Sequence, residues 1–316
     1  MLAHSLLFPG MPYGSAPRWA FAIAEICMLL LMVLCAVHAV RSKRRGALSY
    51  LLGGFLFGLA LEYIEVLSGS YTYGRFHLML GHAPKDIPIC IGAGWGIILY
   101  TARLYSDALR LRPFAAAALD TLLALNIDLS MDVVAYRLHM WHWYWNGTGL
   151  DPLRAQWFGI PYGNFVGWAT VVFCYSLYSR LWERRITQKP GAWRGPVVAV
   201  LALVCAQATL FVTETWIWDF LHRHAGLTSG PRLLLIVLAM ATLIAWGWKR
   251  RESAMQPMDG IALWVPCWFH LYFFFCFAWF HFFRENRWMT AAAAANIVLG
   301  IGMHLLPLRE QRRKQA

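Results

Sequence analysis

The sequence predicts an all-α, polytopic membrane protein with about nine membrane-spanning helices, in a range of roughly seven to nine. Composition is the first observation behind this prediction: 59% of the 316 residues are hydrophobic, 14% are charged, and the mean hydropathy is +0.48. A soluble domain would carry roughly a quarter charged residues. The second observation is a series of long apolar stretches, and the third is the charge of the loops between them.

Each apolar stretch is long enough to cross a bilayer as one helix, which takes about 20 residues. We expect a single integral-membrane helical domain over residues 1–316, with spans at 18–40, 47–69, 87–105, 113–136, 163–181, 195–220, 232–248, 260–283 and 289–307. The longest loop, about 138–162, is rich in Trp and Tyr, which favour the membrane interface.

The loop charges predict the orientation. Lys and Arg gather in alternate loops, at 41–45, 103–112, 180–194, 248–251 and in the C-terminal tail. Because such residues stay on the cytoplasmic side, we expect the N-terminus outside and the C-terminus in the cytoplasm, in a bacterial cytoplasmic membrane. The net charge of +12 then reflects topology and a lipid-bilayer partner, and it does not indicate nucleic-acid binding.

Two pairs of acids lie inside predicted spans. Glu62 and Glu65 are three residues apart in LALEYIEVLSG, and Asp128 and Asp132 are four apart in LNIDLSMDVVAY. Each pair shares a helix face, and acids at this depth are costly enough to be candidates for function. Two close carboxyls in a low dielectric do not both ionise cheaply, so one keeps its proton and lies beside a base. Such a pair suits protonation of an alkene or removal of a proton next to a cation.

The predicted topology groups further acids with these pairs. Glu25 and Glu214 fall in the same outer half of the membrane, whereas Asp120 lies nearer the inner end of its helix. We expect the aromatic loop 138–162 to cover this acidic layer as a lid, with loop 70–86 beside it. In the structural alternative the acids cap helix ends or pair with arginines, for which the candidates are Arg75, Arg103 and Arg137.

Metal binding is a weaker interpretation. Acids suit Mg²⁺ held against a diphosphate, but DLSMD has one acid at each end and lacks DDxxD-like spacing. His139 and His142, and the HRH at 222–224, do not form the HxxxH or HxxHH boxes of membrane desaturases. We therefore predict no metal site. His270 lies in the middle of an apolar run, where it is either a buried proton carrier or a hydrogen-bonding group.

One segment carries a recognisable pattern. DLSMDVVAYRLHMWHWY and then WFGIPYGNFVGW (157–168) contain Asp-x-x-x-Asp, Trp-x-Trp and Gly-Ile-Pro-x-x-Asn-Phe-x-Gly-Trp, and LEYIEVLSGSYTYGRF precedes them. Over about residues 58–170 this pattern resembles the carotenoid-biosynthesis membrane family that includes bacterioruberin-pathway and cyanobacterial carotenoid 1,2-hydratases. The chain departs from the family pattern at Glu65, where a small residue is expected, at Ser68-Gly69 in place of Thr-Gly, and in the turn SYTYGRFH.

The resemblance implies an enzyme acting on a carotenoid or a related polyprene. Its matching positions are the acids Glu62, Asp128 and Asp132, together with Trp143, Pro161, Asn164 and Trp168. The candidate catalytic residues are Asp128, Asp132, Glu62 and Glu65. The candidate substrate-binding residues are Trp143, Trp168, Asn164, Tyr162, Trp95, His77, Glu214 and His270.

The leading hypothesis is a membrane lyase that adds water to a terminal isoprenoid C=C bond. Asp128 or Asp132 would protonate the alkene, aromatic rings would shield the tertiary cation, and Glu62 or its neighbour would deprotonate the attacking water. This chemistry requires no cofactor.

A cofactor-free isoprenoid or terpenoid cyclase or isomerase, using the same acid without water capture, is the closest alternative. A proton-coupled transporter is the second, although the sequence lacks the repeated halves of many transporters. The oligomeric state and the substrate's chain length stay open.

Overall fold

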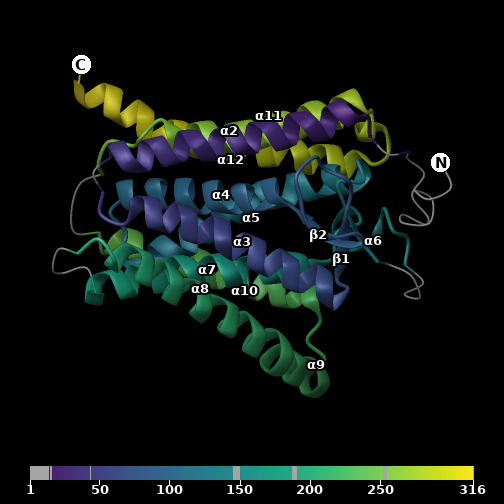
Figure 1. The fold of residues 1–316 in the computed structure, drawn as a ribbon, viewed down its shortest axis with the longest axis horizontal. Coiled ribbons are helices and arrows are strands. Elements are labelled where there is room, and N and C mark those ends of the chain that lie inside the picture. The colour runs from purple at the N-terminus through teal and green to yellow at the C-terminus, as the bar shows by residue number, and fades with distance from the viewer. Residues whose placement is uncertain are drawn as a thin grey trace.

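A computed structural model describes residue 14 and residues 16–42, 44–144, 150–186, 191–251 and 255–315. Within these residues the chain is a bundle of long, roughly parallel helices (Figure 1). The long helices are α2 (Arg18–Arg41), α3 (Ala47–Ser68), α4 (Ile89–Ala108), α5 (Pro113–Arg137), α7 (Tyr162–Ile186), α8 (Arg194–Val212), α10 (Ser229–Lys249), α11 (Ile261–Trp279) and α12 (Arg287–Gln315). Shorter helical segments are α6 (Ala155–Phe158), the π-helix η1 (Thr213–Trp218), α9 (Asp219–Ala225) and the 3-10 turn η2 (Phe282–Arg284).

The predicted all-α, polytopic membrane fold is confirmed. In the described parts of the chain, 7 helices are long and apolar enough to cross a membrane. Two further long helices, α4 and α7, occupy the predicted spans 87–105 and 163–181 and lie alongside the others (Figure 1). Their sequences are more polar, and nearly all of α4 is buried. Because protein surrounds α4, its polar side chains do not face hydrocarbon.

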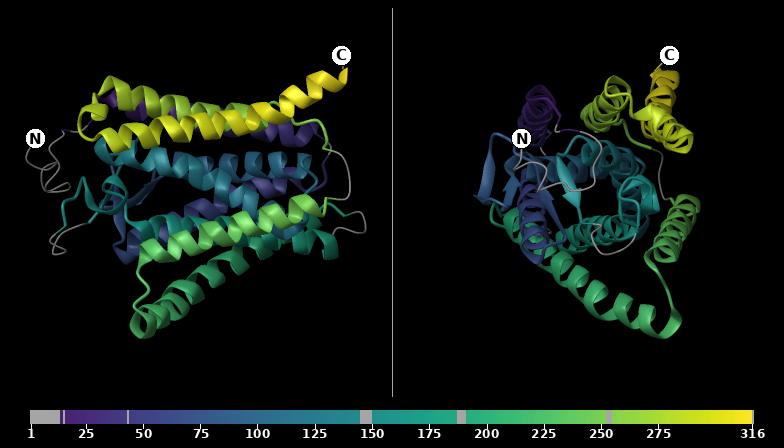
Figure 2. Two further views of the ribbon diagram at one scale, coloured as in Figure 1. Left: turned by 180° about the vertical axis from the view of Figure 1, so that it is seen from behind. Right: turned by 90° about the vertical axis from the view of Figure 1, so that its right-hand side faces the viewer.

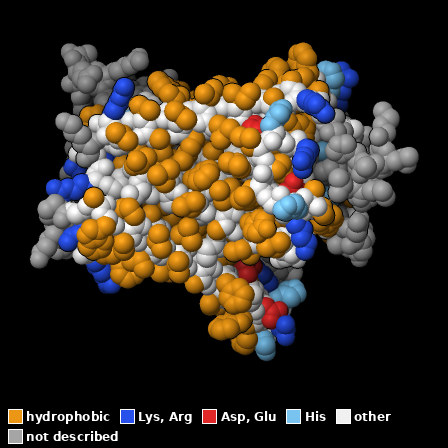
Figure 3. Space-filling view, viewed as in Figure 1, with side chains coloured by type: hydrophobic (Ala, Val, Ile, Leu, Met, Phe, Trp, Pro, Cys, Tyr) orange, Lys and Arg blue, Asp and Glu red, His pale blue; other side chains and the backbone are white. Residues whose placement is uncertain are grey.

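Helices α4 and α5 form the centre of the bundle, as the end-on view in Figure 2 shows. Helix α4 packs against α2, α3, α5 and α11, and α5 packs against α4, α7, α10, α11 and α12. The surrounding helices turn an apolar surface outward (Figure 3), as expected where lipid contacts a protein.

Four short strands cover one end of the bundle. Strand β1 (Tyr71–Tyr73) pairs antiparallel with β4 (Trp141–Trp143), and β2 (Met79–His82) pairs antiparallel with β3 (Lys85–Pro88). The predicted lid, loop 138–162, thus supplies a strand that packs onto the segment directly after α3. Its residues 145–149 lie outside the described part of the chain.

One helix leaves the bundle near this end. Segments α8, η1 and α9 run without a break over Arg194–Ala225, further than the predicted span 195–220. The far half of this helix diverges from α3 (Figures 1 and 2), and η1 packs mainly against α8 and α9, its neighbours in the chain. Isolated π-turns inside α-helices occur frequently at functional sites.

Asp120, the acid expected away from the outer layer, is a structural residue. Its Oδ2 accepts hydrogen bonds from Arg180 Nη1 at 2.7 Å and from Ser176 Oγ at 2.6 Å. Arg180 also donates to Ser106 Oγ at 2.7 Å and Asp107 Oδ1 at 3.1 Å, so this buried network ties α5 and α7 to α4.

We expect Asp120→Leu to lower the stability of the fold strongly. Asp120 is the nearer of the two carboxylates that bind Arg180, so its removal leaves this buried guanidinium compensated by Asp107 alone. Breaking a buried ion pair costs up to about 3–5 kcal/mol. The midpoint of thermal unfolding of the purified protein in detergent measures this loss. The double variant Asp120→Leu/Arg180→Met removes both charges and should recover much of it; a double variant no more stable than the single one would contradict this account.

Candidate functional site

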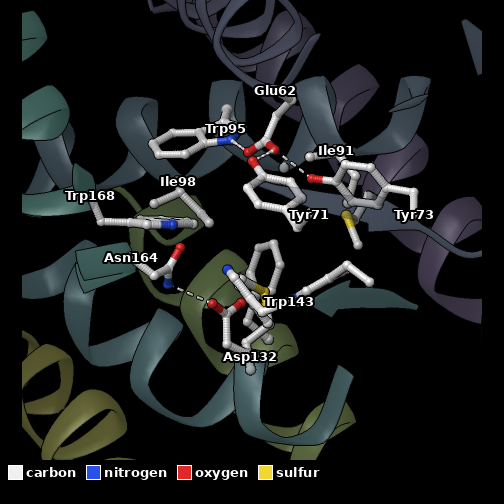
Figure 4. Close-up of a pocket in the computed structure, with 15 residues that line it drawn as sticks. Glu62, Tyr71, Tyr73, Ile91, Trp95, Ile98, Asp132, Trp143, Asn164 and Trp168 are labelled. Atoms are coloured by element: carbon white, nitrogen blue, oxygen red, sulfur yellow. Dashed lines mark hydrogen bonds between the residues drawn. The ribbon is translucent and has the colours of Figure 1, made fainter. Parts of the chain in front are cut away.

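A small chamber lies among α3, α4, α5 and α7, at the end of the bundle that the strands cover (Figure 4). Its volume is about 50 Å³, room for a few waters or one small branched alkyl group. Its wall is largely aromatic and carries two acids. The lining residues are Met28, Glu62, Tyr71, Tyr73, Ile91, Gly94, Trp95, Ile98, Met131, Asp132, Trp141, Trp143, Asn164, Trp168 and Phe269.

Glu62 is held by three hydrogen-bond donors. Gly69, with a φ of 85°, ends α3 in the left-handed conformation that glycine favours, and the chain then returns as β1. Alternation along the strand places Tyr71 and Tyr73 on one face. Both hydroxyls donate to Glu62 Oε2, from Tyr73 at 2.5 Å, and Trp95 Nε1 donates to Oε1 at 2.7 Å.

The tyrosines act as donors because they keep their protons. Burial, and after it the charge of Glu62, hold the pKa of Tyr71 and of Tyr73 well above the usual value of 10. An ionised carboxylate acts only as an acceptor and therefore matches three donors without an O–H group of its own. The arrangement around Glu62 therefore suits an ionised carboxylate.

The second acidic element is the Asp128–Asp132 pair of α5. Both side chains are buried, at 0% and 3% exposure, and the two carboxyls lie close enough to interact directly. Asn164, in the first turn of α7, donates through Nδ2 to Asp128 Oδ2 at 3.1 Å and to Asp132 Oδ2 at 2.8 Å. Asp132 lines the chamber whereas Asp128 lies behind it. Two such close carboxyls are most stable when they share one proton.

The alternative in which arginines neutralise these acids is wrong. Each candidate arginine has another acid as its partner: Arg75 pairs with Asp86 at 3.0 Å, Arg103 with Glu183 at 2.5 Å and Arg137 with Glu285 at 2.7 Å. In the described residues no Lys or Arg forms an ion pair with Glu62, Asp128 or Asp132.

Arg137 has a positioning role. Its guanidinium donates to the carbonyls of Val133, Leu153 and Phe158. These bonds fix the segment before α7 against α5, which brings Asn164 to the aspartate pair.

The expected layer of six acids divides into three groups. Glu62, Asp128 and Asp132 form the chamber group. Glu65 and Glu214 line a second, larger cavity beside it, the vestibule, with a volume of about 440 Å³. Besides the residues that it shares with the chamber, the vestibule is lined by Leu61, Glu65, Ser70, Pro161, Gly163, Gly167, Val171, Leu210 and Glu214.

Glu25 makes up the third group and anchors a loop. Its carboxylate accepts the backbone N–H groups of His77 at 2.9 Å and Leu78 at 2.7 Å, and it contacts His77 Nδ1 at 2.8 Å. A buried carboxylate with these partners is satisfied structurally.

Four of the predicted substrate-binding residues, Trp95, Trp143, Asn164 and Trp168, line the chamber. Trp95 and Trp168 stack with ring centroids 4.1 Å apart. Glu214 lies in the vestibule, and Tyr162 begins α7 just outside both cavities.

The structure places His77 and His270 away from the chamber. His77 is bound to Glu25, with a side chain 64% exposed. His270 is buried near Asn126 and His304 in another part of the bundle.

Sequence reasoning missed Tyr71, Tyr73 and Trp141 as chamber residues. The i, i+2 spacing of YTY after a helix-ending Gly was the available signal, because a strand places both rings on one face. What the sequence does not contain is the pairing of β1 with β4, a contact between residues far apart in the chain.

The histidines of HMWH have structural surroundings. The His142 ring stacks on Tyr136 at 5.2 Å, and burial, followed by the charge of His139, lowers the pKa of His142 to about 4. Within the described residues, no group of three or more His, Cys, Asp or Glu side chains has an arrangement that holds a metal ion.

Comparison with known protein families gives evidence on the biological role of the chain that contains this chamber. The family model described as carotenoid biosynthesis protein matches residues 23–227, more than half of the chain. The chain belongs to the carotenoid biosynthesis protein family. The matched region contains the chamber's acids, Asn164 and nearly all of its aromatic residues, and it extends the resemblance predicted over 58–170 in both directions.

Membership of the carotenoid biosynthesis protein family supports a role in carotenoid biosynthesis. This role and the membrane-spanning helices fit a lipophilic isoprenoid substrate in a bilayer. A search of curated proteins found no match to the chain, and neither did a search of solved structures.

Proposed function

We propose that the protein is a membrane hydro-lyase that adds water to a terminal isoprenoid C=C bond of a carotenoid or related polyprene. One observation carries this proposal: buried acids that form no ion pair with any Lys or Arg of the described residues converge on a small aromatic chamber. Negative charge and aromatic faces both stabilise a developing carbocation. The volume of the chamber suits the branched end of an isoprenoid and not its whole length.

Asp132 is the proposed acid. It faces the chamber and shares its proton with Asp128 behind it, and Asn164 Nδ2 donates to both carboxyls and fixes their positions. The alkene π electrons take this proton at the less substituted carbon, which leaves a tertiary cation and an Asp132 carboxylate. The surrounding tryptophan and tyrosine rings shield the cation until water attacks.

Glu62 is the proposed base. It lies across the chamber from Asp132 (Figure 4), and its three donors fix its orientation. Water forms the new C–O bond at the cation and gives one proton to Glu62, so the product is a tertiary alcohol. Return of that proton through water to the aspartate pair resets the site.

Access for water favours hydration over the alternative cyclisation. The vestibule next to the chamber has a polar rim formed by Glu65, Ser70 and Glu214. Water that enters there reaches Glu62, which lines both cavities. A closed, dry chamber would instead favour attack by a second double bond.

Expression in a host that makes acyclic carotenoids, followed by mass spectrometry of the lipid extract, tests the proposal. We expect a product heavier than its precursor by one water. An isomer of unchanged mass would identify a cyclase or isomerase. Proton-dependent uptake into vesicles without chemical change would identify a transporter; either result would overturn the hydratase proposal.

Tyr73→Phe should slow turnover about 10- to 100-fold. The change removes an O–H donor to a charged carboxylate, a hydrogen bond that contributes about 1.5–3 kcal/mol. Turnover per folded protein measures the effect. Tyr144→Phe is the matched control, because the Tyr144 hydroxyl donates to Thr72 on the other face of the same small sheet. Equal rates in the two variants would argue against a role for the Glu62 donors.

A further inference from the structure

The vestibule is large enough to hold much more than water, and it is continuous with the chamber. Six residues line both cavities: Glu62, Tyr71, Trp95, Trp143, Asn164 and Trp168. Its volume of about 440 Å³ falls in the range of small-molecule pockets, whereas the chamber holds only a small group. A ligand whose end lies in the chamber therefore extends into the vestibule.

The vestibule opens where the continuous helix α8–η1–α9 leaves the bundle. Leu61 and Glu65 of α3, Gly163 and Gly167 of α7, and Leu210 of α8 line its sides. The far half of this helix diverges from α3 (Figure 1), and Figure 3 shows acidic atoms beside hydrophobic side chains at the junction.

Lipid-facing side chains flank this opening. Ile64 and Leu67 on α3 are 54% and 45% exposed, and Phe211 and Trp216 on α8 and η1 are 62% and 66% exposed. Exposed apolar surface of this kind contacts hydrocarbon in a membrane protein. Exposed apolar side chains thus lie on the two helices that border the vestibule, beside its acidic rim.

The face of α7 that lines the vestibule carries two glycines, which have no side chains to fill the cavity. Gly163 and Gly167 lie one turn apart, and a Cβ added to either would meet no atom within 4 Å. Open space over a helix face, bounded by Leu61, Val171 and Leu210, suits an extended hydrocarbon chain better than a polar ligand.

We propose that the vestibule is a lateral port that admits an acyclic isoprenoid chain from the bilayer and holds it along Gly163 and Gly167 of α7, with its terminal group in the chamber. This inference rests on the proposed function for the identity of the chain. Entry from the side spares the polyene any passage through water, where its long apolar surface would be costly to expose.

Retention of lycopene, an acyclic polyene hydrocarbon, tests the port. The full chain is purified in mild detergent from a lycopene-producing host, in an Asp132→Asn background that prevents consumption, and bound polyene per protein is measured by absorbance. We expect Gly163→Phe and Gly167→Phe each to lower retention about tenfold or more, because the new ring occupies the space of the chain. Gly302→Phe is the matched control: this glycine lies on α12 and also has open space around it.

The outcomes separate the port from the proposed reaction. Loss of lycopene in both vestibule variants, with retention in Gly302→Phe, supports the port even where the unsubstituted chain forms no hydrated product. Retention in the vestibule variants equal to that of the control would overturn the port even where hydration occurs. Failure of the Asp132→Asn protein itself to retain lycopene would overturn it as well. Thermal unfolding of each variant identifies any loss caused by misfolding.

Discussion

Asp132→Asn should reduce turnover by about 10²- to 10⁴-fold, the usual contribution of a general acid. The amide keeps the size of the side chain and its hydrogen bond with Asn164, but it has no acidic proton to give. Asp128, the other carboxyl of the pair, does not line the chamber and so does not present its proton to the alkene. Product formed per folded protein, in membranes supplied with an acyclic carotenoid, measures the loss.

Two comparisons sharpen this prediction. Asp128→Asn should have a smaller effect than Asp132→Asn, because Asp128 lies behind the chamber wall. Asp120→Asn is the matched control: it makes the same chemical change on the same helix, in a carboxyl bound to Arg180. It should lower stability while leaving turnover per folded molecule near normal. Near-normal turnover in both Asp128→Asn and Asp132→Asn would exclude the aspartate pair as the acid.

Glu62→Gln should produce the second largest loss, also about 10²-fold or more. The change removes the negative charge that faces the cation and the group that takes the proton from water. Since the side chain has nearly the same size, binding of the isoprenoid should change little. We therefore expect kcat to fall with KM almost unchanged, as for an interaction made mainly in the transition state.

Glu65→Gln provides the comparison for Glu62. Glu65 is three residues away on the same helix but lies in the vestibule, where Ser70 donates to it at 2.7 Å. Its substitution should affect rate far less. A Glu65→Gln variant as slow as Glu62→Gln would move the base from the chamber to the vestibule.

The sequence predicted the helical part of the fold well because hydropathy is a local property. Each predicted span corresponds to a long helix, and even the polar span at 163–181 is a helix in the bundle. The alternating direction of the predicted helices also placed Glu62 and Asp132 toward the same end of the bundle, where both line the chamber. The predicted depth in the membrane did not show which of two neighbouring acids on one helix faces the chamber. Glu62 lines both the chamber and the vestibule, whereas Glu65 lines only the vestibule, a distinction that depends on how α3 and α4 pack.

Contacts between segments that lie far apart in the chain could not be predicted from the sequence. Tyr71 and Tyr73 were visible only as part of a turn, and their role depends on the return of β1 toward Glu62. His77, in the loop 70–86, was predicted to bind substrate, but its backbone and ring bind Glu25 from α2. His270 lies at membrane depth in the sequence, yet α11 directs it toward Asn126 and His304, away from the chamber.

Isotope labelling tests the central claim most directly. The purified protein in lipid vesicles is given an acyclic carotenoid in water enriched in ¹⁸O, and the product is analysed by mass spectrometry. Proton transfer from Asp132 followed by water capture predicts a tertiary alcohol that carries one oxygen, derived from the labelled solvent, and that Asp132→Asn forms about 10²-fold or more slowly. A product of unchanged mass, or an alcohol formed equally by Asp132→Asn, would contradict the account.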